Sequence, residues 1–282
     1  MEEHGTLERL LLHDRRLVIV TLLLVTALAW VYTLLGVGMG MTTFEMTRAP
    51  WQEPMSHNME MNMGMASEMA MDIDTRNTGA GHYIAMLLMW WLMMIAMMLP
   101  SATPTILLAA AINRRSSTEN PPYGKTAFFV AGYLGAWLFF SVVAVLAQGV
   151  MVKNGVLTPM MHSSSTLLTA CILIIAGIWQ VSPIKQACLR HCRSPVHYLT
   201  QHRRPGNLGA FTMGVGHGSY CLGCCWFLMA LLFVGGVMNL YWIIGLALFV
   251  LLEKLLAHGV WFGKISGVVL IASGLLMAVT QL

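Results

Sequence analysis

The sequence predicts an all-α fold, a polytopic transmembrane bundle of about seven helices with a cytoplasmic N-terminus. Of its 282 residues, 57% are hydrophobic and only 10% are charged, whereas soluble domains carry about 25% charged residues. Several apolar runs also exceed the ~18 residues that mark a membrane-spanning helix. This composition excludes an ordinary soluble domain and predicts a multi-pass protein surrounded by membrane lipid.

The chain divides into a short N-terminal part and a long membrane domain. Residues 1–16 are polar and predicted to be cytoplasmic, and residues 17–38 form the first transmembrane helix. That run is too long for a signal-peptide core and lacks a clear small-residue cleavage site. Residues 39–81 are a Met/His-rich outer loop, and residues 82–282 are the helical membrane domain. Its predicted spans cover residues 83–112, 126–150, 166–181, 208–238, 241–257 and 259–282.

The basic residues are sorted between the two ends of the predicted bundle. With the N-terminus inside, the inner segments carry 13 of the 16 Lys and Arg residues, and the outer segments carry Arg48, Arg76 and Lys153. Short loops rich in Lys and Arg stay in the cytoplasm. The sorting therefore predicts a bacterial inner-membrane topology and explains the net charge of +4 without a nucleic-acid partner.

The strongest chemical signal is the stretch from Gly216 to Trp226. On a helix at about 100° per residue, four soft ligands fall on one face: His217, Cys221, Cys224 and Cys225. Small residues on the same face predict close approach to a neighbouring helix, and the aromatic residues lie on other faces. Cysteine also packs in membranes as a small hydrophobe, but a histidine and three thiols together favour a soft-metal site.

A second signal is the density of methionine in the 39–81 loop. Ten methionines lie between Met39 and Met71, and the candidate ligands are His57, Met59, Met61 and Met63. Thioethers bind Cu(I) well. The alternative is a Met-rich loop without a metal, although exposed methionine is open to oxidation.

The methionines continue into the second predicted span. His82, Met86, Met89, Met93 and Met97 repeat at steps of four, three, four and four residues, which places them on one helical stripe. Such a stripe is either core packing or a path for a soft ion. Met93 and Met97 are the candidate ligands within the membrane.

The most basic loop, residues 183–207, holds a third group of ligands. Cys188 and Cys192 are one helical turn apart, and His191 lies beside them. This spacing suits either a reduced surface thiol pair or a cytosolic metal site.

Glu253 is the one acid inside an apolar run. A carboxylate at membrane depth predicts a functional or paired role. Its candidate partners are Lys254, Lys264 and His217, and the alternative is a structural pair at the helix end.

Three motifs carry a resemblance to a known family. They are MMLPS at Met97–Ser101, SPxKxxCLxxC at Ser182–Cys192 and HGxYCLGCCW at His217–Trp226. Over roughly residues 80–280 the chain resembles a bacterial family of predicted metal-binding integral membrane proteins. The resemblance implies a helical membrane fold and metal binding. Separately, the Met-rich loop and span are similar in composition to copper-uptake channels.

These patterns together predict a membrane protein that binds a soft metal, most strongly Cu(I), with zinc as the second choice. The expected role is copper uptake, delivery or homeostasis, with the metal ion and a metallochaperone or metalloenzyme subunit as partners. Two alternatives remain open: a redox or metal-assisted enzyme built on the Cys/His/Glu set, and an accessory subunit for metalloenzyme assembly.

Overall fold

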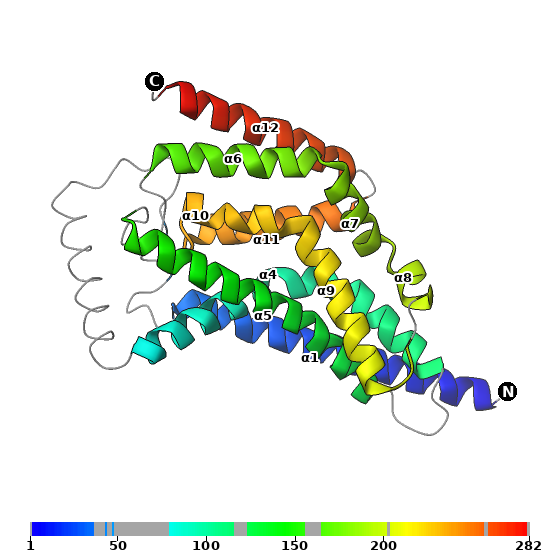
Figure 1. Cartoon of the computed structure of the whole chain (residues 1–282). Helices are drawn as coiled ribbons and strands as arrows, with labels where there is room; N and C mark the ends of the chain where they lie inside the picture. Colours follow the sequence, from blue (N-terminus) through cyan, green and yellow to red (C-terminus); the bar gives the residue numbers. More distant parts are fainter. Residues whose placement is uncertain are drawn as a thin grey trace.

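The protein is built from helices packed lengthwise against each other (Figure 1). The computed structural model describes residues 2–36, 43, 47, 79–115, 123–155, 165–201, 204–256 and 259–280. Throughout these residues the regular elements are α-helices, which confirms the all-α prediction. The helices are α1 (Glu2–Leu35), α4 (Gly79–Arg115), α5 (Tyr123–Lys153), α6 (Thr166–Val181), α7 (Pro183–Arg193), α8 (Pro195–Gln201), α9 (Gly206–Ala230), α10 (Leu232–Gly235), α11 (Leu240–Leu255) and α12 (Gly259–Val279).

Helix α1 lies on the outside of the bundle and packs against α4. It begins at Glu2, so the polar residues 2–16 continue directly into the predicted first span. The helix ends at Leu35, and Gly36 after it has a φ of 59°, the left-handed conformation that commonly terminates helices. Leu22 and Ala29 are buried against the bundle. Much of the remaining apolar surface is exposed, as expected of a helix that faces lipid.

Helix α4 forms the centre of the hydrophobic core. Residues 93–99 are all buried, so this helix contacts neighbours on every side along that stretch. Pro100 and Pro104 lie inside the helix without ending it. A proline removes one backbone N–H, and hydroxyl groups supply hydrogen bonds nearby: Ser101 Oγ donates to the Met98 carbonyl and Thr103 Oγ1 donates to the Leu99 carbonyl.

Helices α5 and α9 pack backbone against backbone. A Cβ atom added at Gly132 would lie 2.2 Å from the Phe211 carbonyl oxygen, and one added at Gly214 would lie 2.0 Å from the Phe129 carbonyl oxygen. Small residues permit this approach between membrane helices. The predicted smooth face of residues 208–238 therefore lies against α5.

The predicted 183–207 loop is largely helical, because α7 and α8 occupy most of it. Helix α7 leaves α6 at a bend of 62°. Ser182 accepts a hydrogen bond from the Ile184 N–H, and Pro183 occupies the first turn of α7, a pattern that favours a helix start. The bend turns α7 across α9, so residues of the basic loop reach the soft-ligand helix.

Helices α11 and α12 complete the bundle. Asn239 accepts a hydrogen bond from the Tyr241 N–H and caps α11. Helix α12 packs along α6, opposite α1 in the bundle (Figure 1). Gly177 and Gly267 line this contact, where an added Cβ would lie within 3 Å of the facing helix.

Five helices in the described residues are long and apolar enough to cross a membrane. These spans are Arg15–Leu35, Gly81–Arg114, Gly124–Lys153, Gly206–Gly235 and Gly259–Val279. The bent pair α6–α7 would add a sixth. Helix α11 has 16 residues, slightly fewer than the ~18 typical of a span. By length and composition the described chain thus holds five or six spans, and the count of about seven stays a prediction.

Candidate metal centre

The four soft-ligand residues of α9 are all buried, as their common face predicts. His217 is 3% exposed, and Cys221, Cys224 and Cys225 are at most 1% exposed. Trp226, on another face, is 42% exposed. Phe227, which also lies off the ligand face, is partly buried, and its ring lies 5.2 Å from that of Trp179.

Sulfur atoms from three helices meet around the C-terminal half of α9. The Cys192 thiol of α7 lies close enough to the thiols of Cys221 and Cys224 to interact with them electrostatically. The Cys225 Sγ lies 3.9 Å from the Met98 Sδ of α4. We call Met98, Cys192, Cys221, Cys224 and Cys225 the sulfur cluster. The cluster brings together Cys192 of the predicted cytosolic loop and the three cysteines of α9, which lie in separate segments of the sequence.

Two thiols of the cluster are held by the backbone of their own helix. Cys224 Sγ and Cys225 Sγ both donate to the Cys221 carbonyl, at 3.0 and 2.9 Å. Within the described residues, no group of three or more His, Cys, Asp or Glu side chains is arranged to hold a metal ion as it stands. Metal binding by more than two of these thiols would therefore require side-chain rotation.

Polar atoms from two other helices contact the Cys221 thiol. Lys254 Nζ of α11 donates to Cys221 Sγ at 3.0 Å and to Ser101 Oγ of α4 at 3.1 Å. The Tyr133 hydroxyl of α5 lies 3.2 Å from the same sulfur. All four of these side chains are buried. Cys221 is therefore the thiol of the cluster that has a cation beside it, and the thiolate is the form of cysteine that binds metals.

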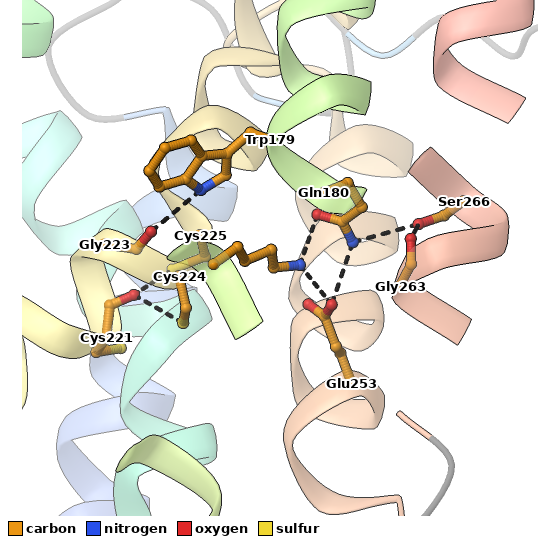
Figure 2. Close-up of polar contacts among 10 residues, drawn as sticks. Trp179, Gln180, Cys221, Gly223, Cys224, Cys225, Glu253, Gly263 and Ser266 are labelled. Atoms are coloured by element: carbon orange, nitrogen blue, oxygen red, sulfur yellow. Dashed lines mark hydrogen bonds and ion pairs between the residues drawn. The ribbon is translucent and has the colours of Figure 1, made fainter. Parts of the chain in front are cut away.

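Glu253 has a different partner from those predicted. Its Oε1 accepts from Lys185 Nζ of α7, and from Gln180 Nε2 at 3.2 Å. Gln180 also receives a hydrogen bond from Lys185 at 2.5 Å and donates to Ser266 of α12 at 3.2 Å. Figure 2 shows Gln180, Glu253 and Ser266 facing one another beside the cysteines of α9.

The predicted partners of Glu253 were wrong for a geometric reason. Lys254 is its neighbour in α11, but successive helical residues point about 100° apart, so Lys254 faces Cys221 instead. Lys264 is exposed. His217 lies among the rings of Phe129, Tyr133 and Tyr198. Lys185 comes from a segment 68 residues away, and only the bend between α6 and α7 brings it here.

The methionine stripe of α4 lies in the core. Met86, Met89, Met93 and Met97 are between 0% and 8% exposed. The Met86 Sδ accepts a hydrogen bond from Gln148 at 3.2 Å. Met98, on the adjoining side of the helix, contacts the sulfur cluster. Burial suits core packing and a dry sulfur path equally, so the ligand roles of Met93 and Met97 stay predictions.

Three other candidate ligands lie around the cluster: His217, His191 and Cys188. The Nδ1 atom of His217 is buried and has no hydrogen-bond partner. The His191 ring stacks on Tyr220 at 4.2 Å, and its Nδ1 lies 2.9 Å from the Ala187 carbonyl. Cys188 is partly buried and packs against Gly223. The predicted ligands His57, Met59, Met61 and Met63 lie outside the described residues.

Sequence reasoning missed several residues of the site. Lys185, Gln180, Tyr133 and Ser101 are polar side chains in or beside apolar runs, and each is buried. Their position in apolar segments is the signal that would have singled them out. Their partners depend on how the helices pack, which no local pattern gives.

The fold and the site define an all-helical protein with helices of membrane-spanning length and a buried cluster of soft sulfur ligands. A family model described as PpoB2, copper chaperone, matches residues 87–277. The match covers more than half of the chain, which therefore belongs to the copper chaperone family. No curated protein and no solved structure matches the chain. The predicted resemblance to a metal-binding family is thus confirmed at the level of copper handling.

Proposed function

We propose that the chain is an inner-membrane protein that binds Cu(I) at the sulfur cluster and delivers it to a copper-requiring protein. The observation that carries the proposal is the cluster itself, in which four thiols and a thioether from three helices meet in a buried region. Thiolate and thioether sulfur select soft ions such as Cu(I). Cu(I) accepts few ligands, so a cluster without a preformed three-ligand group still suits it.

The arrangement of the helices supports a route through the molecule. The methionines of α4 run from its N-terminal half to Met98, which touches Cys225. In this route the 39–81 loop collects the ion and the α4 methionines pass it to Cys221, Cys224 and Cys225. Cys188, His191 and Cys192 of α7 receive it on the cytosolic side. His217, one turn before Cys221, offers an additional nitrogen.

Metal content of the purified protein tests the proposal. The apo protein in detergent is loaded with Cu(I) under anaerobic reducing conditions, and copper per protein is measured beside a thermal melt. We expect Cys221→Ser/Cys224→Ser to keep the fold, because serine is nearly isosteric with cysteine, and to lose most of the bound copper. Cys171→Ala is the control, since Cys171 is exposed on α6. Equal copper in the wild type and the double variant would remove the site from α9.

Delivery is tested separately from binding. The copper-loaded protein is mixed with an apo copper protein, and transfer is followed by the metal content of each after separation. Cys192→Ser should slow transfer more than it lowers binding, because Cys192 stands on α7 at the edge of the cluster and is partly exposed. Transfer at the wild-type rate would contradict the role of α7. For Glu253 we propose a structural role, which its contacts with Lys185 and Gln180 support.

A further inference from the structure

The buried charges beside the sulfur cluster do not balance. In the described part of the chain, the side chains of Lys185, Glu253 and Lys254 are the buried charged ones, two cations and one anion. Lys185 is paired with Glu253. Lys254 is 7% exposed, and its ammonium group donates hydrogen bonds to a sulfur and a hydroxyl. Arg193, which is partly exposed, is also basic, so it cannot supply the missing negative charge. It donates a hydrogen bond to the Leu256 carbonyl.

An unbalanced ammonium in this position points to an anionic partner. A buried charge is costly unless it is paired, and membrane surroundings add to the cost. Lys254 lies 3.0 Å from Cys221 Sγ and is held there by Ser101. The sulfur cluster is therefore the group whose negative charge Lys254 can offset.

Resting on the proposed function, we propose that Lys254 is the fixed countercharge of the sulfur cluster and sets its preference for Cu(I) over Zn(II). When two thiols bind Cu(I), two Cu–S bonds form and the thiol protons leave to solvent. Two thiolates and Cu(I) carry one negative charge, which the Lys254 ammonium cancels. Two thiolates and Zn(II) are already neutral, so Lys254 would then be an uncompensated buried cation. Zinc would need a third thiolate, for which the described residues offer no ready arrangement.

Substitutions at Lys254 separate its charge from its hydrogen bonds. Lys254→Met removes both, Lys254→Gln keeps hydrogen-bonding capacity without the charge, and Lys254→Arg keeps the charge. Lys264→Met is the matched control, because Lys264 is an exposed lysine on α12. Each purified protein is titrated with Cu(I) against a colorimetric Cu(I) chelator, and with Zn(II) against a zinc-sensitive dye. A thermal melt and gel filtration report whether each variant is folded.

The expected result is a change of selectivity as well as affinity. In Lys254→Met and Lys254→Gln, Cu(I) binding weakens by about tenfold or more while Zn(II) binding is unchanged or stronger. Lys254→Arg and Lys264→Met keep the wild-type preference. If Lys254→Gln folds and its ratio of Cu(I) to Zn(II) affinity stays within about twofold of wild type, the countercharge role is wrong and the copper site stands. A wild-type protein that binds no Cu(I) would instead overturn the proposed function.

Discussion

At the scale of single residues, two groups of polar side chains in the core meet at adjacent positions of α11. Glu253 joins α7 and α6 through Lys185 and Gln180, and Lys254 joins α4 and α9 through Ser101 and Cys221. The first group fixes the bent helix α7, and the second lies at the sulfur cluster. A change at Glu253 should therefore act on stability, and a change at Lys254 on metal choice.

Glu253→Gln is expected to destabilise the protein by about 3–5 kcal/mol, because breaking a buried ion pair leaves Lys185 uncompensated. Lys185→Met/Glu253→Gln should recover much of the loss, since neither charge then remains. Leu248→Ala is the control on the same helix, where the side chain is 52% exposed. Thermal melts in detergent measure all three. If Glu253→Gln were as stable as Leu248→Ala, the ion pair between Lys185 and Glu253 would contribute little to stability.

Sequence reasoning at this scale predicted the burial of the candidate ligands better than it predicted their neighbours. The shared face of His217, Cys221, Cys224 and Cys225 follows from helical periodicity alone, and all four are buried. The contact of Cys192 with α9 could not be predicted, because it depends on the 62° bend before α7. The same bend brings Lys185 to Glu253. Tertiary packing, rather than any local pattern, decides these pairs.

At the scale of helices, glycine positions determine how closely α5 and α9 approach, and thereby where the cysteines lie. Gly132 and Gly214 face the backbone of the opposite helix. The sequence predicted that α9 has a smooth face, but it did not identify α5 as its neighbour. It also left most of residues 183–207 as a loop, whereas α7 and α8 are helical there.

Gly132→Ala should destabilise this pair of helices, because the new methyl group would lie 2.2 Å from the Phe211 carbonyl oxygen. Overpacking of this kind costs about 1–3 kcal/mol, which exceeds the gain of about 1 kcal/mol in helix propensity. Gly135→Ala on the same helix meets nothing within 4 Å, so it should be neutral or slightly stabilising. Thermal melts compare the two, and equal stability would mean that α5 and α9 are not in backbone contact.

At the scale of the whole molecule, the helical class and most helices follow from hydropathy, because each apolar run is long and bounded by polar residues. The number of crossings is harder to predict. Helices α6 and α11 have 16 residues each, near the lower limit for a span. Their length therefore places both helices at the boundary between a full and a partial crossing.

At the same scale, we predict that the N-terminus and residues 183–207 face the cytoplasm and that residues 39–81 face outward. The 13-to-3 sorting of basic residues motivates it. In Figure 1, α7, α8 and the start of α1 lie towards one end of the bundle, and the first turns of α4 and the last turns of α12 lie towards the other. This arrangement fits the predicted sides.

Reporter fusions in cells measure the topology without altering the cysteines of the site. A periplasm-active reporter inserted between residues 39 and 81 should be active, and the same reporter between residues 201 and 206 should be inactive. A cytoplasm-active reporter at the same two positions should give the reverse pattern and serves as the control. Activity of the cytoplasmic reporter in the 39–81 segment would reverse the orientation. The methionines there would then meet copper only after it had crossed the membrane, and the proposed route from that loop through α4 to α9 would fail.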